Sequence, residues 1–263
     1  MRQIVIHNPF GAPVFHEETV GSTMDVSRSL AVKGRPHGTV IAADFQETGR
    51  GRIRERSWEA ERGQNLIFTI LLRYPCIEEI PTGLTLRAGL AVALAVEDFF
   101  PSLSGRVKIK WPNDVLIVPA GGEAAKKLSG ILAEADGGNV HLGIGINVAQ
   151  KEFPAHLRDT AASISLAIKK EFTDREKSAF LEKVLQRLHD EIAKNDNHWR
   201  ERLARRLYGK GDRVCFAPGA ADTGKKVTGT LAGIGEGGEL LIIPDGETGA
   251  QYFITGELRG ILL

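Results

Sequence analysis

Cysteine is scarce in this sequence, and that scarcity excludes two kinds of stabilisation. The 263 residues include only Cys76 and Cys215, which lie far apart and match no metal-binding or redox spacing. Disulfides and zinc sites are therefore not expected. Such cysteine usage is typical of a reducing compartment, so the sequence predicts a cytoplasmic protein.

Long apolar runs are also missing. Residues 1–9 contain too short an apolar stretch for a signal peptide, and no later segment is expected to cross a membrane. The sequence therefore predicts a soluble protein that makes no membrane contact.

Net charge is nearly absent as well. Lys and Arg number 34 against 33 for Asp and Glu, which gives +1 at pH 7. A protein that binds duplex DNA is expected to be more basic, and the residues before Gly21 indicate an edge strand and a turn rather than a helix-turn-helix. DNA binding is therefore not expected, and a cluster of arginines must serve a local purpose.

The length allows one large domain and one small domain. Residues 39–45 and 66–72 are typical of strands, and residues 81–100 are typical of a helix. From Tyr208 onward the pattern changes to short alternating strands with many glycines, which predicts a small all-β barrel. The expected domains are residues 1–207 and 208–263.

The most unusual stretch is 46–58, in which an arginine occupies every second position: Arg50, Arg52, Arg54 and Arg56. An extended backbone would place these arginines on one side, where they repel one another unless an anion lies between them. Guanidinium groups match phosphate oxygens, the bare Gly49 and Gly51 let the main chain approach a ligand, and Trp58 offers a face for a nucleobase. The alternative is an exposed basic loop balanced by nearby glutamates.

Other polar residues also allow two interpretations. Ser22 or Thr23 can cap a helix, with Asp25 completing a Ser-x-x-Asp capping box, or can hold a polar ring of a ligand. Asn113 and Asp114 follow a Trp-Pro break, where they form a turn or lie beside arginines or a metal-bound phosphate. Lys127 stands at the start of an apolar strand, either solvated or functional.

Residues 140–148 are typical of a strand with one nearly bare face. Its apolar residues share the other face, while the bare face carries His141, Gly143, Gly145 and Asn147. Such glycines indicate either close helix packing or a flat ligand lying on the sheet. Asn147 favours the ligand, because its amide can bind the edge of an adenine.

Five short motifs occur together in one order: Gly21-Ser22-Thr23, Gln46-x-x-Gly49-Arg50-Gly51-Arg52, Lys110-Trp111-Pro112-Asn113-Asp114, Lys127-Leu128-x-Gly130-Ile131-Leu132 and Gly143-x-Gly145-Ile146-Asn147. In this order they resemble the biotin protein ligases, over about residues 15–150 and the C-terminal barrel. The resemblance implies an α+β fold: a mixed, mostly antiparallel sheet flanked by helices, related to the class II aminoacyl-tRNA synthetases, followed by an SH3-like barrel. The family usually has Asn where this sequence has Met24.

The resemblance also implies an activity. Such a ligase joins biotin to ATP, giving biotinyl-5′-AMP and pyrophosphate, and then passes the biotinyl group to one lysine of a biotin carboxyl carrier domain. Mg²⁺ is expected to bind through the ATP phosphates, without a metal site of the protein. The chain resembles the monofunctional type that lacks an N-terminal DNA-binding domain, and a homodimer formed through sheet edges is plausible for this family.

Site residues follow from the matched motifs. The residues implied for biotin are Ser22, Thr23, Gln46, Gly49, Arg50, Gly130, Gly143 and Gly145. The residues implied for ATP or the adenylate are Arg50, Arg52, Arg56, Trp58, Asn113, Lys127 and Asn147. Lys127, Arg52 and Asp114 are the expected catalytic residues, with Asp114 orienting either an arginine or the incoming lysine amine.

Two alternatives are open, one a related enzyme and the other a protein of another class. A lipoate or octanoate ligase shares the fold and the adenylate chemistry, but is not expected to carry the doubled Gly-Arg before a tryptophan. A nucleic-acid-binding module would combine the arginine loop with a β-barrel, and the near-zero net charge argues against it.

Overall fold

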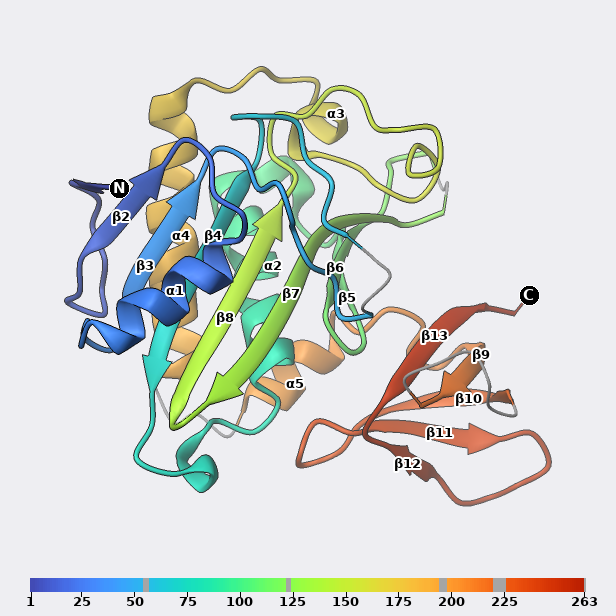
Figure 1. The fold of residues 1–263 in the computed structure, drawn as a ribbon. Helices are drawn as coiled ribbons and strands as arrows, with labels where there is room; N and C mark the ends of the chain where they lie inside the picture. Colours follow the sequence, from blue (N-terminus) through green and yellow to red (C-terminus); the bar gives the residue numbers. More distant parts are fainter. Residues whose placement is uncertain (54–56, 122–123, 194–197, 220–225, 263) are drawn as a thin grey trace.

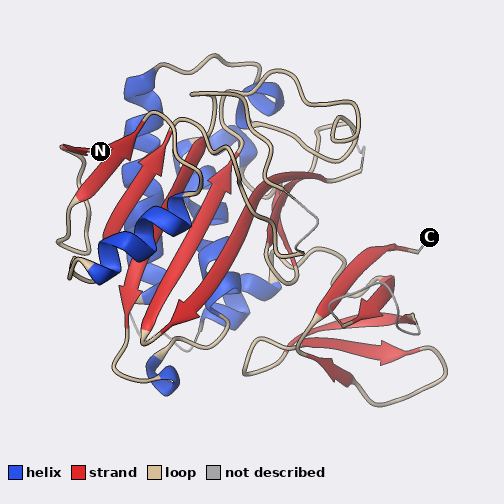
Figure 2. Cartoon of the chain, in the orientation of Figure 1, coloured by secondary structure: helices blue, strands red, loops and turns tan. Residues whose placement is uncertain are grey.

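The computed structural model describes residues 1–53, 57–121, 124–193, 198–219 and 226–262. An eight-stranded sheet forms the larger part (Figures 1 and 2), with the strand order β1-β2-β3-β4-β8-β7-β6-β5. Only β2 and β3 pair in parallel; the other neighbours are antiparallel. The predicted mixed, mostly antiparallel sheet is therefore confirmed. Its strands are β1 (Arg2–Ile4), β2 (Val14–Glu17), β3 (Thr39–Ala43), β4 (Leu66–Arg73), β5 (Val107–Lys110), β6 (Asp114–Ile117), β7 (Lys126–Asp136) and β8 (Asn139–Ile146).

Helices cover both faces of this sheet (Figure 1). The long helices α2 (Leu84–Phe99) and α4 (Asp174–Ile192) pack against each other on one face, with α5 (Trp199–Ala204) beside α2. Gly89 of α2 lies against the sheet, because an added Cβ would stand 3.7–3.8 Å from side chains of β5, β6 and β7. The short helices are η1 (Ile77–Glu79), η2 (Pro101–Leu103), which packs against α2, and α3 (Ile164–Ile168).

One apolar stretch is long enough to span a membrane, contrary to the sequence prediction. Within the described residues, the stretch Ile77–Phe99 has the length and the apolar composition of a membrane-spanning helix. Most of its apolar window, 61%, is buried inside the structure, and side chains all along α2 contribute to the hydrophobic core. The stretch is therefore the core helix of the fold.

Helix α1 (Thr23–Val32) covers part of the opposite face, over β3, β4 and β8. Ser22 caps it by accepting a hydrogen bond from the backbone N–H of Met24, as the sequence predicts. Ser27 of this helix hydrogen-bonds Nδ1 of the fully buried His141 at 2.8 Å. Burial lowers the pKa of His141, so the imidazole is neutral under this helix at pH 7.

A second, smaller sheet follows at the C-terminus (Figure 1). Its five strands are all antiparallel, in the order β12-β11-β10-β9-β13. They are β9 (Arg213–Pro218), β10 (Val227–Ile234), β11 (Leu240–Pro244), β12 (Gln251–Phe253) and β13 (Gly256–Ile261). The expected all-β C-terminal unit is present, while the boundary at residue 207 stays a prediction.

Trp111 joins the two sheets. It follows β5 and is almost fully buried; its indole N–H donates to the carbonyl of Gly238 at 2.9 Å, and its ring meets Phe216 edge-on at 5.8 Å. Main-chain bonding between Ile109 and residues 206–208 adds a second link. These contacts hold the turn that carries Asn113 and Asp114 against the small sheet.

Candidate functional site

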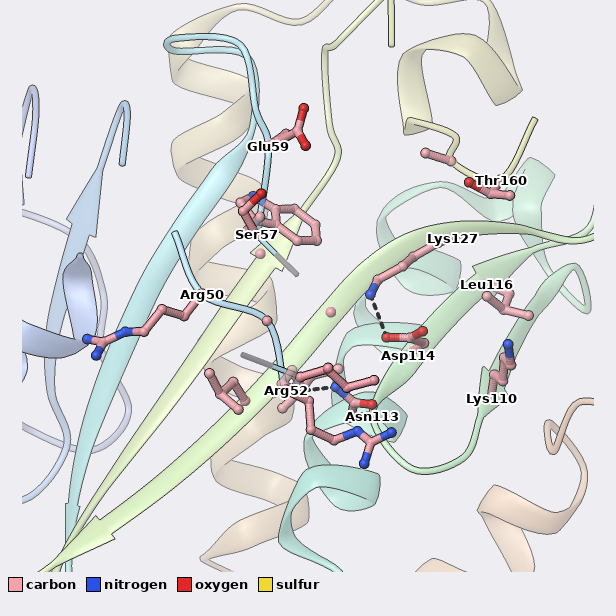
Figure 3. Close-up of a pocket in the computed structure, with 18 of the residues that line it drawn as sticks. Arg50, Arg52, Ser57, Glu59, Lys110, Asn113, Asp114, Leu116, Lys127 and Thr160 are labelled. Carbon is pink, nitrogen blue, oxygen red and sulfur yellow. Dashed lines mark hydrogen bonds and ion pairs between the residues drawn. The ribbon is translucent and has the colours of Figure 1, made fainter. Parts of the chain in front are cut away.

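A cavity of about 780 Å³ opens on the α1 face of the large sheet (Figure 3). Its walls come from the start of α1, the arginine stretch, the β5–β6 turn, the segment 156–161 and β13. Most of the residues singled out from the sequence line it: Ser22, Thr23, Gln46, Arg50, Arg52, Trp58, Asn113, Asp114, Lys127, Gly130, Gly143 and Gly145. The structure thus gathers residues from five separate motifs around one space.

One corner of the cavity is polar and buried. The backbone N–H and the hydroxyl of Thr23 both donate to Oε1 of Gln46 at 2.8 Å. Thr69 lies 2.8 Å from the same hydroxyl, and must donate to it, because the only hydroxyl proton of Thr23 is directed at Gln46. The oxygen of Gln46 is thereby satisfied, and its amide N–H groups remain as donors for an incoming acceptor.

The bare face of β8 exists and borders the cavity, and two side chains lie close over its glycines. Gly145 faces Gly130 across β7 and β8, and a Cβ at Gly145 would stand 2.5 Å from Trp58. At Gly143 a Cβ would stand 3.2 Å from the sulfur of Met24. The glycines therefore admit an indole and a thioether onto the sheet, where the sequence suggested either a helix or a flat ligand.

Lys127 and Asp114 form an ion pair across β7 and β6, with Nζ 2.7 Å from Oδ1 (Figure 3). The lysine side chain passes over Gly130, whose Cβ would stand 3.2 Å from Nζ. Its main chain is fixed too, because its N–H donates to Thr160 and its carbonyl accepts from Ala162. The predicted partners of Asp114 were an arginine or an incoming amine; in this structure its partner is Lys127.

Arg50 and Arg52 do not share one side, as an extended backbone would require. Arg50 donates to the carboxylate of Asp25 on α1, whereas Arg52 donates to the carbonyl of Gly256 at the start of β13, at 2.9 Å. The chain bends after Arg50 instead of staying extended, so the two guanidinium groups point apart (Figure 3). Arg54 and Arg56 lie outside the described residues.

Two other predicted residues are placed differently from the expectation. A Cβ at Gly49 would stand 2.7 Å from the carbonyl of Trp58, so this glycine lets the two ends of the arginine stretch pack together. Asn147 is buried, and its amide donates to the carbonyl of Ala162 at 3.1 Å. Neither residue lines the cavity, so the expected contacts of Gly49 with biotin and of Asn147 with adenine stay predictions.

Sequence reasoning missed part of the lining. The segment from His156 to Ala161 and the β13 residues from Glu257 to Gly260 line the cavity, as do Lys110 and Tyr208. The Lys-Trp-Pro-Asn-Asp motif contained a signal for Lys110. The segment 156–161 carries no motif and is placed by main-chain bonding to Lys127, and β13 is brought in only by the packing of the small sheet.

Comparison with known proteins gives a consistent family assignment. Residues 18–150 match the biotin/lipoate A/B protein ligase family. The chain is 35% identical over 165 residues to the bifunctional ligase/repressor BirA of Bacillus spizizenii, covering 60% of this chain and 47% of that protein. It is 36% identical over 134 residues to the biotin–[acetyl-CoA-carboxylase] ligase of Mycobacterium tuberculosis, covering 51% of this chain and 48% of that protein.

A solved structure extends the likeness to nearly the whole chain. The biotin protein ligase from Aquifex aeolicus in complex with biotin and ATP has a TM-score of 0.75 and 29% identity, and the match covers 93% of this chain and 97% of that one. By contrast, the chain spans about half the length of the curated relatives it matches.

Proposed function

The chain belongs to the biotin/lipoate A/B protein ligase family, and from that membership we propose that it activates biotin with ATP and transfers the biotinyl group to a lysine of a carboxylase carrier domain. The observation that carries this proposal is the cavity itself, which places a lysine paired with an aspartate beside a buried polar corner. The names of relatives point to the same reaction and to acetyl-CoA carboxylase as the source of the carrier.

The first step joins two anions. A biotin carboxylate oxygen attacks the α-phosphorus, the bond to the leaving phosphate breaks, and pyrophosphate departs. Negative charge gathers on the α-phosphate oxygens in the transition state, so a fixed cation there accelerates the step. We assign this role to Lys127, which Asp114 holds over Gly130.

The second step needs no protein nucleophile. The carrier lysine attacks the biotinyl carbonyl as a free amine, an amide bond forms, the bond to phosphate breaks, and AMP leaves as the amine loses its proton. Asp114 lines the cavity and pairs with Lys127, so a lysine that enters there meets a carboxylate already held in place. We propose this carboxylate as the group that orients the incoming amine.

The remaining roles follow the lining of the cavity. Thr23 and Gln46, with Ser22, offer hydrogen bonds to the ureido ring, and Arg52 is placed for a phosphate. Trp58, resting on Gly145, presents an aromatic surface for adenine. Three further points stay predictions: a cytoplasmic location, a homodimer, and the contributions of Arg56, Asn113 and Asn147 to ATP binding.

Magnesium fits this site as a companion of ATP. Among the described residues no group of three or more acidic, histidine or cysteine side chains is arranged to hold a metal. Mg²⁺ is commonly held by substrate phosphates with one or two carboxylates, and the cavity lining includes the carboxylate of Asp114. Bound in this way, the ion would neutralise phosphate charge. Asn113 and Asp114, which line the cavity at the β5–β6 turn, would offer it side-chain oxygens.

The polar corner favours biotin over lipoate or octanoate. An octanoyl chain has no group to accept from the Gln46 amide N–H groups, which are the donors of this corner that remain for a ligand, and leaving such a group unpaired is costly. Biotin-dependent release of pyrophosphate from MgATP tests this choice. We expect release with biotin and little with octanoate or lipoate; the reverse preference would make the protein a ligase of the second kind.

Replacing Arg52 with glycine is expected to make the intermediate escape. Synthesis of the adenylate depends on several cations, so it should continue at a reduced rate. The bound biotinyl-AMP, however, loses one charge-assisted hydrogen bond, worth ~1.5–3 kcal/mol. This loss raises the dissociation rate of biotinyl-AMP by roughly tenfold or more. Free biotinyl-AMP would then biotinylate an unrelated lysine-rich protein in the same tube, detected by blotting.

The matched control for that experiment is Arg62→Gly, an arginine outside the cavity that contacts Glu18 and Thr19. This variant should biotinylate the bystander, the unrelated lysine-rich protein, no more than the parent does. If Arg52→Gly also leaves the bystander unlabelled while still releasing pyrophosphate, Arg52 does not retain the intermediate.

A further inference from the structure

Asp25 stands outside the cavity lining, yet it contacts an arginine of that lining. It lies in the first turn of α1, and its Oδ1 accepts a hydrogen bond from Nη2 of Arg50. The same oxygen accepts from Nη1 of Arg28 at 2.7 Å. The expected capping-box role of Asp25 is thus replaced by a carboxylate shared between two arginines.

The two arginines depend on Asp25 to different degrees. Arg28 also pairs with Glu134 and Asp136 on β7, so it stays fixed if the Asp25 charge is removed. For Arg50, the ion pairs within the described part of the chain involve Asp25 alone. The position of Arg50 is therefore more sensitive to Asp25 than that of Arg28.

The pair directs Arg50 away from the reactive part of the site. Its guanidinium points toward α1, on the side opposite the Lys127–Asp114 pair (Figure 3). In the proposed reaction, the ligand anion must lie close to Lys127, first as the biotin carboxylate and then as the adenylate phosphate. Arg50 cannot keep its present direction and also meet an anion at that place.

We propose that Asp25 is a positioning residue that holds Arg50 aside until the ligand anion competes for it. This inference rests on the proposed function. A carboxylate or phosphate of the ligand offers the guanidinium the same charge-assisted contact as Asp25 does. When the ligand binds, its anion therefore replaces Asp25 as the partner of Arg50. The free energy lost with the Asp25 contact offsets part of the free energy gained from the new contact.

The test compares charged and neutral forms of one ligand by calorimetry on the full chain. The side chains of Asp25 and Arg50 are 54% and 41% exposed, and such pairs are weak, so Asp25→Asn should bind biotin only about two- to fivefold more tightly than the parent. Biotin methyl ester, which lacks the carboxylate charge, should bind the parent and the variant equally.

Two controls separate this effect from a general change of charge. Glu47→Gln removes one exposed negative charge from the same segment as Arg50, and should leave the affinity for biotin unchanged. In an Arg50→Ala background, Asp25→Asn should no longer tighten binding, because the restrained group is gone. Thermal unfolding of each variant verifies that the fold persists.

The outcomes distinguish the inference from the proposed function. If the parent binds biotin but Asp25→Asn binds it equally or more weakly, Asp25 does not restrain Arg50, and the inference is wrong while the function stands. An equal gain for biotin and its methyl ester would also overturn it. If the parent binds no biotin at all, the proposed function fails, and the inference falls with it.

Discussion

Lys127→Ala is expected to slow adenylate formation by roughly 100- to 1,000-fold, the loss of ~2.7–4 kcal/mol that follows removal of one donor to a developing oxyanion. Biotin affinity should change far less, because the lysine acts where charge develops in the transition state. Its ammonium group is held over Gly130 by Asp114 at 2.7 Å. Pyrophosphate release in a single turnover measures the step directly.

Lys126→Ala is the matched control for that variant. Lys126 precedes Lys127 on β7, and its Nζ donates to the carbonyl of Arg158 instead of pairing with Asp114. It should release pyrophosphate at nearly the parental rate. A rate for Lys127→Ala within threefold of the parent would mean that Lys127 is a solvated residue at the start of a strand.

Gly145→Val is expected to weaken biotin binding markedly while the fold persists. Valine favours strands more than glycine does, but its Cβ would meet Trp58 at 2.5 Å. Trp58 must then leave the sheet and intrude on the cavity. Overpacking of this kind costs ~1–3 kcal/mol, and because biotin can bind only when Trp58 is pushed back onto the sheet, the same free energy is lost from binding, about 5- to 150-fold in affinity. Calorimetry with biotin and a thermal melt measure the two effects separately.

Gly143→Ala provides the matched control on the same strand. Its Cβ would meet the Met24 side chain, at 3.2 Å from the sulfur and 3.3 Å from Cγ, and would lie at an ordinary contact distance of 3.6 Å from the carbonyl of Leu132; a methionine adapts readily. Binding should therefore change little. Unaltered biotin affinity in a normally melting Gly145→Val variant would show that the position of Trp58 on the sheet is unimportant for the ligand.

Local patterns in the sequence predicted the parts of the site that depend on local rules. The alternation along residues 140–148 gave a strand with one bare face, and the helix start at Ser22 has the predicted cap. The resemblance to the biotin protein ligases, carried by the five motifs in their order, implied which residues would meet, and most of them line one cavity. The strand and the cap depend on periodicity and capping, which a sequence displays directly.

Directions of side chains could not be predicted in the same way. Arg50 and Arg52 diverge because their partners, Asp25 and Gly256, come from α1 and from the small sheet. Trp58 lies on Gly145 and Asn147 turns toward Ala162 for similar tertiary reasons. A pattern of residue types carries no information on which distant segment supplies a partner, so the wall formed by β13 was missed as well.

The most direct test of the proposed function is the intact mass of a purified biotin carboxyl carrier domain after incubation with this protein, biotin and MgATP. We expect the carrier to gain the mass of one biotinyl group, and a carrier whose target lysine is replaced by arginine to gain nothing. Omission of ATP should prevent the gain. An unchanged carrier mass, in a parallel reaction where an authentic biotin ligase modifies the same preparation, would contradict the assignment of this cavity to biotin transfer.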